Sequence, residues 1–324
     1  MGIDRVSFYR NELRQRYPEI PFPDQSYLIL MSPRSGSTLL CAHLEKIGHG
    51  RPTEGFHFSQ RALVERFGNK VDFSDPYQHI IAALRYGTVN GVYGLKLSWV
   101  EFEVFLQKAR ALIGKEAENI SDAEILEVFF PSAKYLRLER KDKIKQAISY
   151  SKAMQTGIWN EPTGTSEDYR DYVLPAQYNR DHIEALLDNL LAFDLSWQRF
   201  LTRNCIPAFE IVYEDLAKNY VSAMTAICEY LGVENIETLE PPMKRLSDKI
   251  SQEWYERFVS ETAWLKDPDI QQCLQEGDFV SLFFLRSRMM SRVHEREIWK
   301  KLPYNRNKST KRLIYRIQKR FSSK

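Results

Sequence analysis

Cysteines and long apolar runs are scarce in this sequence of 324 residues. Its four cysteines form no C-x-x-C pair, which argues against both a disulfide framework and a zinc site. Because no run of about 18 uncharged apolar residues occurs, the sequence predicts no transmembrane helix. The N-terminal stretch carries charges throughout and has no apolar signal core. We therefore expect a cytoplasmic protein.

Acidic residues are missing from the last twenty residues, 305–324, which contain eight lysines or arginines. The whole chain has 46 basic and 43 acidic residues, so the part without this tail is acidic, which disfavours nucleic acid as a partner. Leu313, Ile317 and Phe321 fall on one helical face among the basic side chains of the tail. This pattern is typical of a peripheral contact with an anionic membrane surface. A solvated end or a subunit contact is the alternative.

Apolar periodicity predicts an α/β protein with a central parallel sheet. Continuous apolar runs, typical of strands buried on both faces, occupy residues 26–32, 91–99, 133–140 and 206–216. Helical spacing predicts helices over residues 4–17, 37–47, 103–113, 142–156 and 176–203. Long helical segments between the strands favour crossover connections, and hence a three-layer, P-loop-like fold flanked by helices. We expect this domain to cover residues 1–262 and a helical, basic C-terminal extension to cover 263–324.

A hydroxyl-rich turn, Ser-Pro-Arg-Ser-Gly-Ser-Thr at residues 32–38, joins the first strand to the next helix. N–H groups at a helix N-terminus are unpaired and point outward, so the turn predicts an anion site. Gly36 lets the backbone approach closely, and Arg34 adds a guanidinium. An ATP-binding loop would need glycine and lysine where Met31 and Ser37 stand, which disfavours ATP hydrolysis. A capped helix without a ligand is the alternative.

A second anion site is expected further along the chain. Arg140 ends a predicted strand, and Ser149 follows nine residues later in the next helix. An arginine and a serine in these places can bind one phosphate, and nucleotides bind at the carboxyl ends of parallel strands. Together with the turn at residues 32–38, the pair predicts a ligand with two anionic ends. A solvated arginine and an unrelated helix serine would look the same.

Six stretches between residues 26 and 260 carry a family resemblance: "YLILMSPRSGSTLL", "RPTEGFHF", "GVYGLKLSW", "RLERKDKIKQAISYSKAMQTGIW", "EIVYEDL" and "RLSDKISQEWYERF". In this order they resemble the bacterial carbohydrate sulfotransferases typified by trehalose 2-sulfotransferase. Members of that family transfer a sulfuryl group from 3′-phosphoadenosine 5′-phosphosulfate (PAPS) to a hydroxyl, typically of a sugar. The resemblance implies PAPS as co-substrate, adenosine 3′,5′-bisphosphate as product, no metal, a sugar or glycolipid acceptor, and a homodimer.

The resemblance also assigns donor-binding residues. It implies that the 5′-phosphosulfate is held by the turn residues Pro33, Arg34, Ser35, Gly36, Ser37 and Thr38. Arg140 and Ser149 would hold the 3′-phosphate. Arg245 and Lys249 precede the stretch "SQEWYERF" and would close a loop over that phosphate, although a solvated basic loop is the alternative.

Three further residues are candidates for the chemistry. An alcohol needs a base, and Glu54 in "RPTEGFHF" lies where the family places its catalytic carboxylate. His57 is the alternative base, and a solvated loop carboxylate is the non-catalytic interpretation of Glu54. Lys96 is the one charge in an apolar strand, which indicates either a site residue or a structural ion pair.

The expected mechanism is in-line displacement. Glu54 takes the proton of the acceptor hydroxyl, whose oxygen attacks sulfur, while Arg34 and Lys96 stabilise the charge that grows on the bridging oxygen. The alternatives are a P-loop kinase or nucleotide hydrolase, and a non-catalytic nucleotide-binding adaptor at a membrane surface. The sequence does not identify the acceptor, because acceptor-binding loops vary most in such folds.

Overall fold

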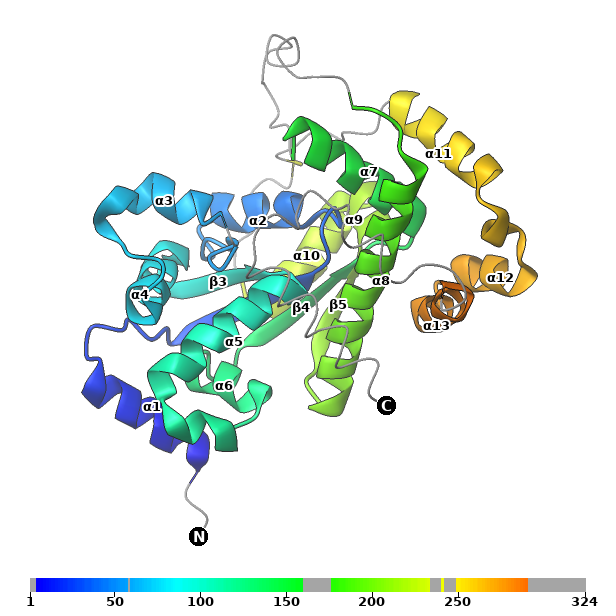
Figure 1. Cartoon of the computed structure of the whole chain (residues 1–324). Coiled ribbons are helices and arrows are strands. Elements are labelled where there is room, and N and C mark those ends of the chain that lie inside the picture. The colour runs from blue at the N-terminus through cyan, green and yellow to red at the C-terminus, as the bar shows by residue number, and fades with distance from the viewer. Residues whose placement is uncertain (1–3, 58, 160–175, 234–239, 242–248, 291–324) are drawn as a thin grey trace. The chain divides into compact units, whose positions relative to one another are not determined.

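The computed structural model (Figure 1) describes residues 4–57, 59–159, 176–233, 240–241 and 249–290. The chain forms two compact units. The first comprises Met1–Arg140 and Ser196–Lys244, and the second comprises Lys141–Leu195 and Arg245–Lys324. This division differs from the one expected at residue 262, which stays a prediction.

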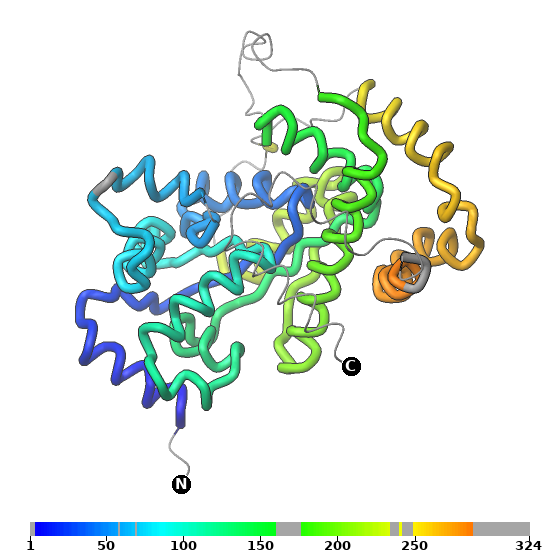
Figure 2. The backbone as a smooth tube through the Cα atoms, viewed as in Figure 1, coloured from blue at the N-terminus to red at the C-terminus, as the bar shows by residue number. Residues whose placement is uncertain are grey.

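A five-stranded sheet forms the centre of the first unit. Its strands are β1 (Gln25–Met31), β2 (Thr88–Val89), β3 (Val92–Leu97), β4 (Lys134–Glu139) and β5 (Ala208–Val212). In the order β2-β3-β1-β4-β5, β1 pairs in parallel with both β3 and β4, β4 pairs in parallel with β5, and β2 runs antiparallel to β3. The chain path (Figure 2) thus returns twice to the side of β1 from distant parts of the sequence. The predicted α/β class with a mainly parallel central sheet is confirmed.

Side chains of β1 point alternately into two separate hydrophobic cores. Leu28 and Leu30 belong to one core and Ile29 and Met31 to the other, because successive side chains of a strand point to opposite faces. The first core includes side chains of α4 (Pro76–Gly87), α5 (Trp99–Ile113) and α6 (Asp122–Phe129). The second includes side chains of α2 (Ser37–Lys46) and α10 (Tyr220–Leu231). Helices therefore cover both faces of the sheet, as the three-layer prediction requires.

Five further elements belong to the first unit. They are α1 (Arg5–Arg16), α3 (Arg61–Phe67), α9 (Tyr213–Lys218), η1 (Gly68–Lys70) and η2 (Lys115–Asn119). The predicted helices over 4–17, 37–47 and 103–113 are confirmed within a few residues. The strand predicted over 206–216 is too long, because α9 begins at Tyr213. Glu214 and Asp215 lie in the first turn of α9, where negative charge favours a helix.

The second unit is helical. It contains α7 (Lys143–Thr156), α11 (Lys249–Glu261), η4 (Ala263–Lys266), α12 (Pro268–Glu276), α13 (Phe279–Met290) and most of α8 (Arg180–Arg203). Its core includes Ile148, Leu187, Phe258 and Leu282. The helical pattern expected beyond residue 262 is confirmed up to Met290, whereas the basic tail lies outside the described residues. No helix in the described part of the chain is both long and apolar enough to cross a membrane.

Candidate active site

The turn between β1 and α2 has an unusual backbone. Arg34 has a φ of 66° and Gly36 a φ of 89°, a region that side chains other than glycine rarely adopt. A Cβ on Gly36 would lie 2.5 Å from the ring of Tyr213, so glycine is required there for two reasons. Strain of the kind seen at Arg34 is typical of functional sites.

The same turn is built to attract an anion. No side chain caps α2 at Gly36, so the first N–H groups of the helix lack that usual partner. The Ser35 residue is fully buried, and its Oγ has no hydrogen-bond partner among the described residues. A ligand that accepts hydrogen bonds would satisfy both groups.

Two arginines meet at this turn. Nη1 of Arg140 donates a hydrogen bond to the backbone oxygen of Arg34 at 3.2 Å, and its guanidinium lies 4.8 Å from the centre of the Tyr213 ring. Burial, and next the charge of Arg140, lower the pKa of Arg34 to about 10. Anionic groups bound to these guanidiniums would relieve this repulsion, since arginine binds phosphate-type groups through paired hydrogen bonds.

Glu54 lies on a loop that is attached to β3. Thr53 forms a parallel bridge with Leu95, and the N–H of Lys96 donates to the Thr53 oxygen at 3.1 Å. The Glu54 carboxylate consequently meets the Lys96 ammonium at 2.9 Å. The strand position of Lys96, opposite Ile29 of β1, places this ion pair near the carboxyl edge of the sheet.

The ion pair keeps both partners charged at neutral pH. Burial raises the pKa of Glu54, but the charge and hydrogen bond of Lys96 lower it by more, so that it lies below its ordinary value. Burial likewise lowers the pKa of Lys96, and the attraction to Glu54 raises it by more. A buried ammonium, 8% exposed, needs such a partner.

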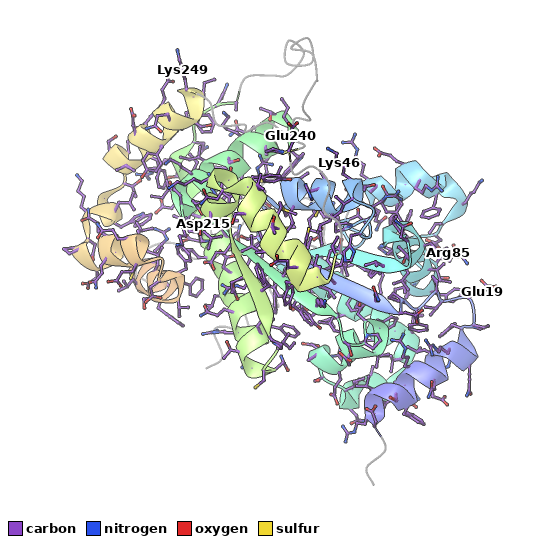
Figure 3. All side chains as sticks on the ribbon, turned by 180° about the vertical axis from the view of Figure 1, so that it is seen from behind. Glu19, Lys46, Arg85, Asp215, Glu240 and Lys249 are labelled. Atoms are coloured by element: carbon purple, nitrogen blue, oxygen red, sulfur yellow. The ribbon has the colours of Figure 1, made fainter. Side chains whose placement is uncertain are left out.

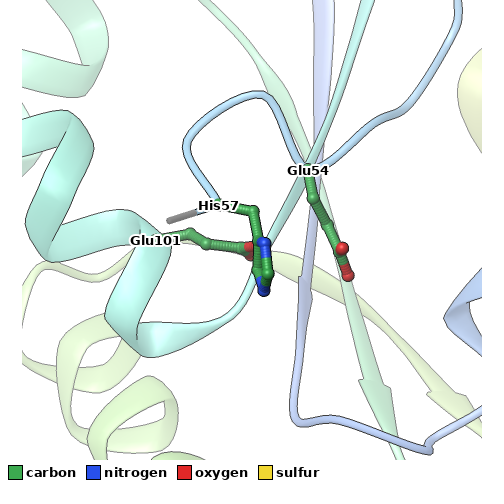
Figure 4. Close-up of side chains that lie close together, drawn as sticks. All are labelled: Glu54, His57 and Glu101. Atoms are coloured by element: carbon green, nitrogen blue, oxygen red, sulfur yellow. The ribbon is translucent and has the colours of Figure 1, made fainter. Parts of the chain in front are cut away.

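His57 and Glu101 lie beside Glu54. The side-chain oxygen and nitrogen atoms of these three residues approach within 4.8 Å of one another, and Figure 4 shows His57 and Glu101 extending to the same place with Glu54 next to them. Such a set can ligate a divalent cation. The Lys96 ammonium supplies positive charge to this cluster, 2.9 Å from the Glu54 carboxylate. The absence of a metal from the reaction stays a prediction.

The sequence did not reveal His79, which holds the Glu54 loop in place. Its Nε2 lies 2.7 Å from the backbone oxygen of Gly55, and the residue is fully buried in α4. Burial lowers the pKa of His79 to about 4, so its ring is neutral and its Nε2–H donates to that oxygen. A lone histidine in an apolar helix gives no signal of such a role, because the partner is a backbone atom 24 residues away.

One pocket is lined by Thr38, the last residue of the hydroxyl-rich stretch, and by the Glu54–Lys96 ion pair. Its volume is about 340 Å³, and it is lined by Thr38, Cys41, Ala42, Glu45, Pro52, Thr53, Glu54, His57, Ser59, Arg61, Ala62, Glu65 and Lys96. Three predicted candidates for the chemistry, Glu54, His57 and Lys96, therefore share this pocket with Thr38 of the predicted anion turn. Acidic, basic and hydroxyl side chains dominate the lining, which suits an acceptor with many hydrogen-bonding groups.

Three other predicted residues belong to the second unit. Ser149 is half-buried on α7 in the second unit. Lys249 is exposed at the first residue of α11 (Figure 3), also in the second unit. Arg245 lies outside the described residues. The roles of these three residues in holding a 3′-phosphate stay predictions.

An anion-binding turn after the first strand of a parallel sheet, next to a carboxylate and a lysine, is typical of transferases that use a phosphorylated donor. A family comparison identifies the class more closely. The Stf0 sulphotransferase family matches residues 26–261, and the chain belongs to this family. It is therefore a sulfotransferase, as the resemblance predicted.

Two curated relatives are similar over most of their length. The trehalose 2-sulfotransferase of Mycolicibacterium smegmatis is 28% identical over 256 residues, which cover 72% of this chain and 94% of that protein. The trehalose 2-sulfotransferase of Mycobacterium tuberculosis is 26% identical over 267 residues, which cover 75% and 97%. Among solved structures, the sulfotransferase domain from the Synechococcus PCC 7002 olefin synthase is 18% identical, with a TM-score of 0.33, over 82% of this chain and 95% of that one.

Proposed function

We propose that this protein transfers a sulfuryl group from PAPS to a hydroxyl group of a carbohydrate or glycolipid. Two relatives named trehalose 2-sulfotransferase support a sugar as acceptor. The polar lining of the pocket supports it too, because a sugar offers many hydroxyl groups to carboxylates, hydroxyls and guanidiniums. The single observation that carries the proposal is that Thr38 of the anion turn and the Glu54–Lys96 pair open on one pocket.

The donor would bind with its 5′-phosphosulfate on the turn. Residues Pro33, Arg34, Ser35, Gly36, Ser37 and Thr38 would surround it, with the N–H groups at the start of α2 and the Arg34 guanidinium facing its oxygens. The 3′-phosphate would be bound by Arg140 and Ser149, and Arg245 and Lys249 would cover it. Fixing both ends of the donor would orient the bond that breaks.

The reaction is an in-line displacement. Glu54 removes the proton of the acceptor hydroxyl, and the acceptor oxygen forms a bond to sulfur. The bond from sulfur to the bridging oxygen breaks, its electron pair stays on that oxygen, and adenosine 3′,5′-bisphosphate leaves. Arg34 and Lys96 stabilise the charge on the bridging oxygen. In this scheme cationic side chains and N–H groups supply all the positive charge.

Glu54 suits the role of base better than His57. The N–H of Ser59 points to Nδ1 of His57 at 3.2 Å, so in the neutral ring Nδ1 accepts and Nε2 carries the proton. Burial lowers the pKa of His57 below its ordinary value, and the neutral form prevails near pH 7. In this tautomer His57 presents a donor to the pocket, whereas the Glu54 carboxylate accepts a proton.

A donor screen and an acceptor screen test the proposal. Thermal unfolding would be measured with PAPS, with adenosine 3′,5′-bisphosphate, and with ATP and Mg²⁺; a shift with the first two alone is expected. Stabilisation by ATP with Mg²⁺ alone would favour the kinase or hydrolase alternative. Mass spectrometry of reactions with PAPS and trehalose, other sugars or glycolipids would then identify the acceptor. Donor binding without transfer to any acceptor would favour a non-catalytic adaptor.

The cellular setting is also part of the proposal. We expect a cytoplasmic homodimer whose basic tail touches anionic membrane, with residues 1–262 as catalytic domain and 263–324 as extension. Light scattering would measure the oligomeric state. Co-sedimentation with anionic vesicles would compare the full chain with one cut after residue 304, and equal binding of both would exclude the tail as the membrane contact.

A further inference from the structure

Glu101 is a buried carboxylate next to the pocket that the proposed mechanism does not use. It is 2% exposed and occupies the third position of α5, in a capping box with Ser98. One Glu101 oxygen accepts a hydrogen bond from the Ser98 N–H at 2.6 Å, and the Ser98 Oγ accepts one from the Glu101 N–H at 3.4 Å. Because α5 directly follows β3, this capping box fixes the carboxylate near Lys96, at the carboxyl end of β3.

Two carboxylates therefore share the surroundings of one buried ammonium. Side-chain atoms of Glu101 and Glu54 lie within 4.8 Å of each other, and Glu54 is the one paired directly with Lys96. Two carboxylates this close do not ionise independently. Burial, and next the charge of Glu54, raise the pKa of Glu101 to about 8. Near neutral pH, Glu54 carries the charge and Glu101 keeps its proton.

We propose that Glu101 is a positioning residue for sulfuryl transfer, which becomes the counter-ion of Lys96 when Glu54 receives the proton of the acceptor hydroxyl. The inference rests on the proposed function. Once Glu54 is neutral, the Lys96 ammonium has lost its partner in a site where an unpaired charge is costly. In the active form Glu101 has already lost its proton to solvent before Glu54 accepts the proton of the acceptor. The ionised Glu101 then keeps Lys96 charged and in place. No covalent bond changes beyond those of the displacement itself.

Titratable and charged groups from several neighbouring elements influence the pKa of Glu101. Glu54 and His57 face it from the loop and Lys96 from β3, and α4 contributes His79, which is bonded to the loop backbone. The rings of Trp197 and Phe200 in α8 pack against Phe102 of α5. Helices α1 and α6 place charged groups against the last turns of α5, away from the capping box. After burial, the charge of Glu54 has the largest influence on the pKa of Glu101, and Lys96 and the hydrogen bonds to Ser98 act in the opposite direction.

Glu101→Gln tests the proposal, because glutamine is also accepted at the third position of a capping box. We expect the kcat of the native enzyme to rise by roughly 10-fold between about pH 6.5 and pH 9 as Glu101 ionises. In Glu101→Gln, kcat should stay near the low-pH value, with KM for PAPS and for the acceptor unchanged within about two-fold. Glu101→Asp, which retains a carboxylate, should recover part of the rise.

Glu124→Gln is the matched control. Glu124 forms the same capping box with Ser121 in α6 but is only partly buried and lies outside the pocket. The pH profile of kcat in Glu124→Gln should match that of the native enzyme. A rise of kcat in Glu101→Gln as steep as in the native enzyme would overturn the proposal, as would loss of the rise in Glu124→Gln.

A measurement without turnover separates this inference from the proposed function. The folded-state pKa of Glu101 lies above the ordinary value of 4.5, so the stability it contributes is complete below about pH 4.5 and is lost as the pH rises toward 8. The native melting temperature should therefore fall over this window relative to that of Glu101→Gln. Parallel curves would overturn the inference. If this fall is observed but no acceptor is sulfated, the proposed function fails instead.

Discussion

Replacement of Glu54 by glutamine removes the proposed base while keeping the size of the side chain. A general base contributes about 10²–10⁴-fold to a rate, so kcat should fall by at least about 100-fold, or roughly 3 kcal/mol of the barrier. The affinity for PAPS should stay within about three-fold, because Glu54 lines the pocket rather than the anion turn. Sulfated product measured by mass spectrometry gives kcat, and calorimetry with adenosine 3′,5′-bisphosphate gives donor-site affinity.

The same substitution has a calculable effect on stability. Breaking a buried ion pair costs about 3–5 kcal/mol. The Glu54 side chain is 39% exposed, so solvent reduces the expected cost to about 1–2 kcal/mol. In a protein of this size that corresponds to a melting temperature lower by roughly 1.5–3 °C. Adding Lys96→Met removes the unpaired ammonium and should restore most of the stability but none of the activity.

Glu210→Gln provides the control for Glu54→Gln. Glu210 is also paired with a cation, Arg137 at 3.3 Å, but it lies outside the pocket, so turnover should be unaffected. A kcat of Glu54→Gln within about ten-fold of the native value would exclude Glu54 as the base. Under that outcome His57→Gln would identify the alternative base by its own loss of turnover.

Three further substitutions test the anion turn and the loop that carries the base. Arg140→Ala should weaken binding of adenosine 3′,5′-bisphosphate by roughly 10- to 100-fold in calorimetry, since charged hydrogen bonds contribute about 1.5–3 kcal/mol each; unchanged affinity would rule out its 3′-phosphate role. Gly36→Ala should abolish donor binding and lower the melting temperature more than Gly91→Ala does. Gly91 has a similar φ of 79°, but its added Cβ would meet nothing within 4 Å, whereas that of Gly36 would meet the Tyr213 ring; equal effects would exclude the clash. His79 has a folded-state pKa of about 4, below its unfolded value, so its stability contribution is present above about pH 6.5 and lost as the pH falls toward 4. The native protein should lose about 2 kcal/mol relative to His79→Asn between about pH 6.5 and 5, as read from chemical denaturation, and parallel curves would count against the buried neutral ring.

Much of the fold was readable because its signals are local. The apolar runs at residues 26–32, 91–99 and 133–140 correspond to β1, β3 and β4, since strands covered by helices on both faces need apolar side chains at every position. The strand predicted to end at residue 216 was placed too far along the chain. Helix α9 follows β5 directly, and the boundary between two adjoining elements is uncertain by a few residues.

The candidate site was predictable in part. The hydroxyl-rich turn at residues 32–38 and the lone lysine of β3 are recognisable because each adds polar side chains next to an apolar strand. Thr38 and Lys96 both line the pocket. His79 and Glu101 were missed for different reasons. His79 acts on a backbone oxygen, which has no sequence signature. Glu101 does have a sequence signature, since Ser98 and Glu101 form a capping box, but that motif indicates the start of a helix and not a charged site.

By itself the sequence determined that the strands are buried on both faces of the sheet, that an anion turn follows the first strand, and which family the chain resembles. Tertiary structure decided which charges face one another. Parallel pairing of β1 with β3 sets Lys96 opposite Ile29, and the bridge from Thr53 to Leu95 brings Glu54 to the same edge. These contacts join residues some forty to seventy positions apart. The energy of such an ion pair depends on distance and burial. Neither quantity can be read from the spacing of residues along the chain.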